Sequence, residues 1–173
     1  MQSTISDYQA NAVPTSFQVA VVMQSQPAMS QWAKDHWQAV GVVVTGEQSA
    51  KAHTPTQPVL LREQGQIRQF LYPGFEIVLH PDECESYYYN IISDNPRCYI
   101  IANETEDGPP EPFLVSMCFD EAHSYLEGEG EIYDVDVPPE LYRWVEAYVV
   151  THYIPEIRKK RKRDNWKDDG KKS

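Results

Sequence analysis

A series of short apolar segments, separated by turns of only a few residues, is the feature that most constrains how this chain can fold. In one stretch the sequence predicts strands at Val59–Arg62, Ile67–Tyr72 and Phe75–Leu79. Gly65 and the pair Pro73-Gly74 mark the turns between them, because glycine and proline are typical of tight turns. A parallel crossover needs about a dozen residues or more, so connections this short favour antiparallel pairing.

Similar segments occur on both sides of this stretch. Phe17–Met23 and Val40–Val44 are continuous apolar runs of strand length. Between them, Ser30 is a suitable N-cap for a short helix that would extend through Trp37. Further strands are predicted at Tyr87–Ile92, Arg97–Ala102, Phe113–Cys118 and Ile132–Val137, the first two as a hairpin about the turn at residues 93–96.

Two helices are predicted in the last third of the chain. Asp120 is expected to cap a short helix over Glu121–Glu127, which Gly128 would end. A longer helix is expected over Pro139–Tyr153, since proline is tolerated in the first turn of a helix. Residues spaced three and four apart along it predict a stripe that packs on the sheet. They are Leu141, Trp144, Val145, Tyr148, Val149 and His152.

Together these elements predict an α+β fold. We expect one antiparallel sheet of six to eight short strands, either open or barrel-like, packed with the long C-terminal helix. Residues 1–16 are predicted as a flexible N-terminal arm, residues 17–157 as a single globular domain and residues 158–173 as a basic disordered tail. The expected core residues are Val19, Val21, Val42, Leu71, Ile77, Ile100, Leu114, Leu141, Trp144, Val145 and Tyr148.

The charge of the chain is divided between an acidic body and a basic tail. The whole chain carries a formal charge of −11. Residues 1–157 contain 23 Asp and Glu against 6 Lys and Arg, a net −17, whereas residues 158–173 contain 9 Lys and Arg against 3 Asp, a net +6. An acidic body repels phosphate backbones, so a nucleic-acid role would rest on the tail alone. The acidity also suits basic protein partners, but solubility is the main reason that we expect for it.

The sequence predicts neither a membrane span nor a secretion signal. No apolar run approaches the roughly 18 residues that a spanning helix needs, and no Lys or Arg precedes Lys34. Cys84, Cys98 and Cys118 are widely spaced and form no Cys-x-x-Cys pair, which argues against a disulfide framework or a zinc module. We therefore expect a cytoplasmic protein whose cysteines are buried apolar residues.

Two groups of residues are candidates for metal binding. His80, Asp82 and Cys84 alternate in the sequence, so in an extended segment they would share one side. A strand end followed by a turn explains them as well. The acidic run from Glu127 to Asp136 would suit a hard cation or a basic partner, but a charged edge strand is the commoner use of this pattern. We expect no metal site and no cofactor.

The aromatic residues would serve either as a stacking platform or as core and partner-facing residues. A platform for a base or a flavin would need several rings on one surface. Core and partner-facing roles are the simpler interpretation, because alternation along a strand would direct neighbouring tyrosines to opposite faces. The residues concerned are Trp32, Trp37, Tyr87, Tyr88, Tyr89 and Trp144.

Six consecutive cations follow the long helix. They would contact nucleic acid or anionic lipid, or pair with an acidic protein surface, including that of the chain itself. Pairing with protein is favoured over nucleic acid. The residues expected to bind a partner are Trp32, Trp37, Arg158, Lys159, Lys160, Arg161, Lys162 and Arg163.

Several segments together resemble a family of short proteobacterial proteins known as domain of unknown function 3305. They are Phe17–Met23, the residues from Trp32 to Val42, the predicted hairpin from Tyr87 to Ile101 and residues 112–122. The similarity continues through Val137–Tyr142 and Trp144 into the basic run at residues 158–163, so it covers about residues 17–163. The order of the segments carries the resemblance, since no single segment is specific.

The resemblance implies that the gene lies near formate dehydrogenase genes, as the genes of family members look to do. It therefore implies an accessory role around a molybdenum- or tungsten-dependent formate dehydrogenase. It implies no reaction. The acidic pair Asp120 and Glu121 would suit catalytic carboxylates, but a helix N-terminus explains it more simply, and the sequence contains no complete catalytic set.

We therefore expect a non-enzymatic accessory or adaptor protein that acts in assembly or regulation of a formate dehydrogenase. Its partner would be that enzyme or one of its maturation factors. One alternative is a small-molecule enzyme or ligand-binding domain with a pocket in the sheet. The other is a nucleic-acid-associated protein that acts through its basic tail.

Overall fold

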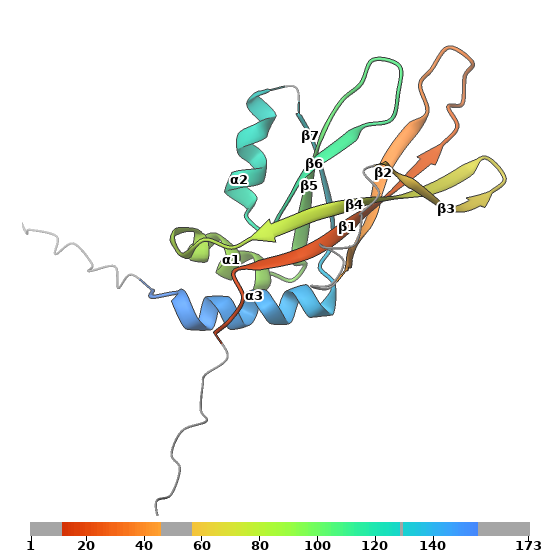
Figure 1. The fold of residues 1–173 in the computed structure, drawn as a ribbon. Helices are drawn as coiled ribbons and strands as arrows, with labels where there is room; N and C mark the ends of the chain where they lie inside the picture. Colours follow the sequence, from red (N-terminus) through yellow and green to blue (C-terminus); the bar gives the residue numbers. More distant parts are fainter. Residues whose placement is uncertain (1–11, 46–56, 129, 156–173) are drawn as a thin grey trace, which may run out of the picture.

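The computed structural model describes residues 12–45, 57–128 and 130–155, which form two antiparallel sheets and several helices (Figure 1). The first sheet has the order β2-β1-β4-β3, from strands β1 (Ser16–Gln26), β2 (His36–Val44), β3 (Val59–Gln64) and β4 (Ile67–Val78). The second has the order β6-β5-β7, from β5 (Arg97–Asn103), β6 (Glu111–Ser116) and β7 (Gly130–Asp136). The predicted α+β class with antiparallel strands is confirmed.

The helices lie between and after the strands. The 3-10 turn η2 (Pro81–Glu83) leads into α1 (Cys84–Ile91), α2 (Phe119–Ser124) continues into the 3-10 turn η3 (Tyr125–Glu127), and α3 (Pro139–His152) comes last. Figure 1 shows α3 along one side of the sheets, while the β1–β2 and β5–β6 connections project on the opposite side. No helix in the described ranges has the length and apolar character needed to cross a membrane.

The expectation of one sheet, open or barrel-like, is wrong, because the described strands form two separate sheets and neither closes into a barrel. The physical reason lies in the segment predicted as the strand Tyr87–Ile92, which is helical in α1. Tyrosine and isoleucine favour strands locally, but Cys84, Tyr87 and Ile91 are buried together at helical spacing. The chain therefore leaves the first sheet after β4, and β5 begins a new one.

The predicted turn at Pro73-Gly74 is also absent, since β4 runs through it as one long strand. Gly74 has a φ of 90°, a conformation that glycine adopts at little cost. The register between β1 and β4 shifts at this point, between Val19 and Val21. A bulge therefore accommodates the proline, which has no N–H for the ladder.

The short helix predicted between Ser30 and Trp37 is replaced by a single turn. The Ser30 carbonyl accepts a hydrogen bond from the Ala33 N–H at 3.0 Å, and the Ser30 hydroxyl accepts one from the Trp32 N–H at 3.3 Å. Trp37 lies in β2, opposite Ser25 of β1. So short a segment gains little from helical hydrogen bonds without an apolar face to bury.

The later helices follow the predictions more closely. The predicted helix Pro139–Tyr153 is confirmed as α3. The other helix begins earlier than expected, at Phe119, because Cys118 rather than Asp120 is its N-cap and its Sγ accepts a hydrogen bond from the Glu121 N–H at 3.4 Å.

The core lies between the facing sides of the two sheets and α3. Nine of the eleven predicted core residues are buried. Leu71 and Leu114 are only half-buried, because their pairing with Val22 and Ile101 places them on the outer faces of their sheets. Residues 1–11 of the predicted N-terminal arm lie outside the described residues, and so does the whole basic tail.

Candidate functional site

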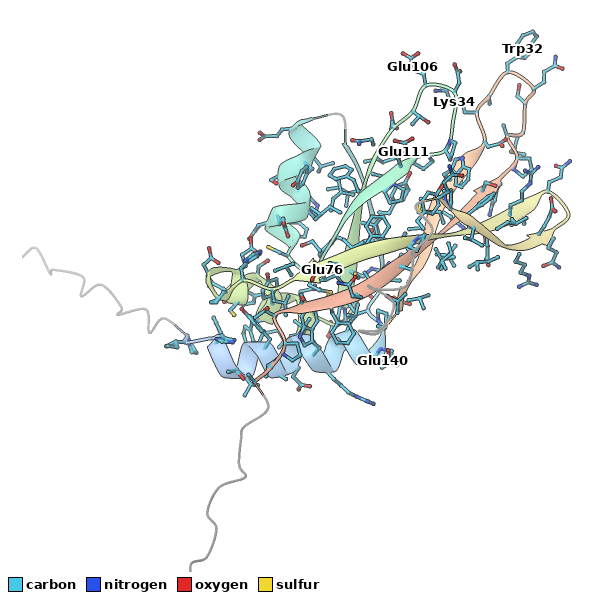
Figure 2. All side chains as sticks on the ribbon, in the orientation of Figure 1. Trp32, Lys34, Glu76, Glu106, Glu111 and Glu140 are labelled. Atoms are coloured by element: carbon cyan, nitrogen blue, oxygen red, sulfur yellow. The ribbon has the colours of Figure 1, made fainter. Side chains whose placement is uncertain are left out.

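A cleft of about 440 Å³ lies between the β1–β2 connection and the β5–β6 connection. One wall consists of residues 34–37 at the start of β2, and the other consists of residues 104, 105 and 107–110 together with Glu131 and Tyr133 of β7. Strand β2 packs against β7, which brings together two segments that are about 70 or more residues apart in the sequence. Figure 2 shows Trp32 and Lys34 on the first connection and Glu106 on the second.

Two aromatic rings, Trp37 of β2 and Tyr133 of β7, line the cleft. The half-buried Trp37 ring packs near Phe70, with ring centroids 5.7 Å apart. The Tyr133 hydroxyl donates a hydrogen bond to Glu131 Oε2 at 2.7 Å. Burial raises the pKa of Tyr133, and the bond to Glu131 raises it further, so the hydroxyl stays protonated and remains a donor. Both rings are therefore held by contacts of their own.

The cleft is strongly acidic. Four carboxylates line it against one lysine, Lys34, and within the described ranges none of these carboxylates forms a salt bridge. Unpaired carboxylates in a concave site produce a negative potential that attracts cations. The four residues are Asp35, Glu104, Asp107 and Glu131.

The two connections have locally determined shapes. Asp35 Oδ1 accepts a hydrogen bond from the Ala28 N–H at 3.3 Å across the first connection. In the second, the Thr105 hydroxyl donates to the Pro109 carbonyl at 2.9 Å. A Cβ at Gly108 would lie 3.0 Å from the Thr105 Oγ1, so a side chain there would press on this bond. The walls of the cleft are thus shaped before any partner binds.

Two large apolar side chains project from the tip of the β1–β2 connection. Trp32 is 89% exposed, and Met29 is also fully accessible. Tryptophan is enriched among the residues that dominate protein interfaces. The tip therefore offers an apolar anchor on the same connection as Lys34 and Asp35, which line the acidic cleft.

The structure separates the residues that the sequence singled out. Trp32 and Trp37 lie at the same end of the molecule, one at the tip and one in the cleft wall. The other predicted partner-binding residues, Arg158, Lys159, Lys160, Arg161, Lys162 and Arg163, lie outside the described residues. Tyr87 and Trp144 are buried in the core, and Tyr88 and Tyr89 lie on α1. The aromatic set therefore forms no common stacking platform.

The alternating ligand set His80, Asp82 and Cys84 does not form, because this segment is a 3-10 turn and a helix start rather than a strand. The His80 N–H donates to the Tyr87 hydroxyl at 3.1 Å, and Cys84 is buried. In the acidic run, Arg97 binds Asp134 and Asp136, while Glu129 lies outside the described residues. Across the described part of the chain, no group of three or more His, Cys, Asp or Glu residues is placed to hold a metal ion.

The three cysteines are free and buried, as expected from their apolar surroundings. Burial raises the pKa of the Cys98 thiol to about 12, so that thiol stays protonated at neutral pH. Cys118 serves as a helix cap, and its Sγ–H donates a hydrogen bond to the Ser86 Oγ at 3.4 Å. These are the roles of packed side chains rather than of nucleophiles.

Of the carboxylates of the cleft, only Glu131 belongs to a segment that the sequence analysis considered, the acidic run from Glu127 to Asp136, and Asp35, Glu104 and Asp107 were not among the predicted site residues. Asp35, Glu104 and Tyr133 are too far apart in the sequence to form a local spacing pattern. The sequence feature that indicated these residues was the high acidity of the connections around the predicted strands. Only the packing of β2 on β7 shows which of the many acidic residues converge.

A scan against protein-family models matches residues 18–163 to a family described as Protein of unknown function (DUF3305). A search of curated proteins and a search of solved structures returned no match.

Proposed function

The chain belongs to the DUF3305 family, and from this premise we propose that it is a non-enzymatic adaptor protein that binds a basic protein partner through the acidic cleft. The partner would be a molybdenum- or tungsten-dependent formate dehydrogenase, or one of its maturation factors, in whose assembly or regulation the adaptor acts in the cytoplasm. One observation carries the proposal: Trp32 is 89% exposed on the β1–β2 connection, whose residues Lys34 and Asp35 line a cleft with four carboxylates.

The chemistry of the cleft supports a basic partner. Carboxylates such as Asp35 and Glu104 form charge-assisted hydrogen bonds with lysine and arginine side chains. Trp37 and Tyr133 supply ring faces that attract the same cations. At the tip of the β1–β2 connection, the Trp32 indole would insert into an apolar pocket of the partner, since a few buried aromatic anchors supply most of the energy of an interface.

The identity of the partner rests on the family resemblance. The resemblance implies that the genes of family members lie near formate dehydrogenase genes. An accessory protein of a metalloenzyme needs a binding surface rather than a reaction of its own. The cleft and the exposed tip provide such a surface.

A binding measurement with purified formate dehydrogenase from the same source tests the proposal. We expect Trp32→Ala to weaken binding by about 30-fold, as for an interface anchor. The pair Glu104→Gln with Asp107→Asn should weaken it about tenfold and reduce its salt dependence. Glu76→Gln with Glu140→Gln is the matched control, because it changes the net charge equally at two labelled positions away from the cleft (Figure 2). Equal affinity of all variants would reject the cleft as the binding site.

A second test addresses the role in the cell. Deleting the gene should lower formate-dependent dye reduction and the metal occupancy of the formate dehydrogenase. Unchanged activity together with unchanged occupancy would rule out a role in maturation.

The size of the cleft favours a second candidate, binding of a small cationic ligand. A volume of about 440 Å³ falls within the range of small-molecule sites, about 300–1,000 Å³. Native mass spectrometry of freshly purified protein distinguishes the two, because a co-purifying organic cation that is lost in the Glu104→Gln and Asp107→Asn variant would favour the ligand.

A further inference from the structure

A second exposed apolar surface lies on α2 and on the 3-10 turn η3 that continues it. Phe119 is 49% exposed and Leu126 is 53% exposed. His123 follows Phe119 by four residues and precedes Leu126 by three. The junction residues Ser124 and Tyr125 have right-handed helical backbone angles, so the helical path is unbroken from α2 into η3. Phe119, His123 and Leu126 therefore share one side of the helix, and we name these three residues the α2 face.

The α2 face lies on the outer side of the second sheet. Successive side chains of a strand point to opposite sides of a sheet. In β5, Cys98 and Ile100 belong to the main core, whereas Tyr99 and Ile101 pack with Ala122 of α2 in a separate cluster. Figure 1 shows α2 on the opposite side of this sheet from β2.

The rings of the α2 face are held in place by contacts within the chain. The Phe119 and His123 rings stack, with centroids 3.7 Å apart and planes inclined by 24°. Both meet the buried Tyr99 ring edge-on, at centroid distances of 5.9 and 6.0 Å. His123 Nδ1 lies 2.8 Å from the Phe119 carbonyl oxygen and donates to it, because a carbonyl only accepts. These side chains therefore have little freedom to lose when a partner binds.

The surroundings of the α2 face are acidic. The exposed Asp120 and Glu127 border it, since Asp120 follows Phe119 directly and Glu127 lies four residues after His123. The sequence contains no Lys or Arg between Arg97 and Arg143, a stretch that includes α2, β6 and β7. Arg97 itself is paired with two aspartates of β7. The α2 face is thus an apolar strip beside carboxylates, and its charge complements a basic surface.

We propose that the α2 face binds a basic amphipathic helix of a partner protein. The apolar side chains of that helix contact Phe119 and Leu126, and its lysines or arginines pair with Asp120 and Glu127. A helix fits this surface because side chains spaced three and four residues apart form a ridge that packs into the groove of another helix. A membrane or a nucleic acid would bring its phosphates against the carboxylates, which repel them.

The α2 face is independent of the acidic cleft. Glu131 and Tyr133 of β7 line the cleft, whereas Ile132, which lies between them, packs with the cluster beneath α2. The two surfaces are therefore on opposite sides of the same strand. Binding at the α2 face goes beyond the role proposed for the cleft and does not depend on it.

Fluorescence anisotropy with synthetic peptides tests the α2 face on the full-length chain. The probe is a labelled peptide of lysines with leucines at every third or fourth position, and its match has alanine in place of each leucine, which preserves the helix propensity. We expect the chain to bind the leucine peptide about tenfold more tightly, because leucine buries more apolar area.

Phe119→Ser with Leu126→Ser should abolish this preference. Leu126→Ser alone leaves the contacts of the Phe119 and Tyr99 rings intact and should reduce the preference to about threefold. It therefore tests the proposal even where circular dichroism shows that the double variant is unfolded. Val43→Ser with Val59→Ser, at exposed valines of the first sheet (46% and 42%), is the matched control and should keep the tenfold preference.

A further pair of variants tests the charges. Asp120→Asn with Glu127→Gln should weaken the binding of both peptides and reduce the difference between low and high salt. Glu76→Gln with Glu140→Gln changes the net charge equally at labelled positions on β4 and α3 (Figure 2) and should leave the affinities nearly unchanged.

Four results would overturn the proposal. One is a leucine preference that is absent from the parent chain or survives in the Phe119→Ser and Leu126→Ser variant. A second is a preference that is lost in the Glu104→Gln and Asp107→Asn variant, which would assign the peptide to the cleft. A third is a gain of about tenfold in affinity on removal of residues 158–173, which would show that the chain's own tail occupies the face. The fourth is a dimer in sedimentation that the Phe119→Ser and Leu126→Ser variant dissociates, which would assign the face to a second copy of the chain.

Discussion

The indole Nε1–H of Trp144 donates a hydrogen bond to the carbonyl oxygen of Pro14 at 2.6 Å, joining two residues 130 positions apart. The Trp144 ring is 6% exposed and lies 4.9 Å from the Phe17 ring, measured between centroids. The start of β1 is therefore attached to α3, and the helix that covers the core is positioned by the opposite end of the described chain.

We expect Trp144→Ala to lower the free energy of unfolding by about 3–5 kcal/mol, because it leaves a cavity beneath α3. Trp144→Phe keeps an aromatic ring but leaves the Pro14 carbonyl without its donor, so its cost should be smaller, about 1–2 kcal/mol. Urea unfolding of the two variants measures both values. A loss below about 1 kcal/mol for the alanine variant would contradict the buried position of the ring.

Asn90 on α1 is a buried polar residue whose side chain joins three elements. Its Nδ2 donates to the carbonyls of Arg97 and Met117 at 2.8 and 3.0 Å, and its Oδ1 accepts from the Arg97 N–H at 2.9 Å. Asn90→Ala leaves these buried groups unsatisfied and should lower the free energy of unfolding by about 2–4 kcal/mol. The exposed Asn95 is the matched control, and Asn95→Ala should change stability by less than about 0.5 kcal/mol.

Stability should fall as the solution becomes strongly alkaline. Burial raises the pKa of the Cys98 thiol from 9.0 to about 12, so between these values the unfolded chain releases a proton that the folded chain retains. The stabilisation from this group is complete below about pH 9 and is lost as the pH rises toward 12. Burial raises the pKa values of Tyr72 and Tyr133 as well, which adds to the loss.

Urea unfolding at pH 8 and pH 11 measures this dependence, and Cys98→Ala, compared at the same two values, isolates the thiol. The alanine variant should lose less stability between pH 8 and pH 11 than the parent chain. An equal loss in both would show that the thiol contributes nothing to the alkaline transition.

Removing residues 158–173 should leave the thermal stability nearly unchanged, because this segment is almost wholly polar and its cations repel one another. The remaining residues 1–157 carry a net charge of −17. Salt-sensitive attraction to acidic partners should therefore disappear, while attraction to basic partners persists or strengthens.

Calorimetry of the truncated chain and partner retention at low and high salt measure both effects. Equal retention of one acidic partner by both chains would show that the tail is not the binding element. Specific retention of DNA or RNA by the full chain alone would favour the nucleic-acid alternative.

The candidate site illustrates which residues could be predicted and which could not. Trp32 and Trp37 could be predicted as partner-binding residues, because they are large aromatic side chains that lie outside an apolar run. Asp35 and Glu104 carried no such signal, because the chain contains 26 acidic residues and nothing local distinguishes those that converge on the cleft. Their convergence is a property of sheet packing.

The sequence by itself determined the helices and strands whose residues have a strong local preference for one secondary structure. The stripe from Leu141 to Tyr148 specifies the long helix, since only a helix places these residues on one face, and the closely spaced turns determined the antiparallel pairing.

Tertiary structure alone decided the rest. The segment around Tyr87 became a helix because that conformation buries Cys84, Tyr87 and Ile91 in one core, an energy that exceeds the local preference of tyrosine for strands. The same packing separated the strands into two sheets and opened the acidic cleft between their connections. Contacts between residues distant in the sequence carry these energies, so no pattern within a short window encodes them.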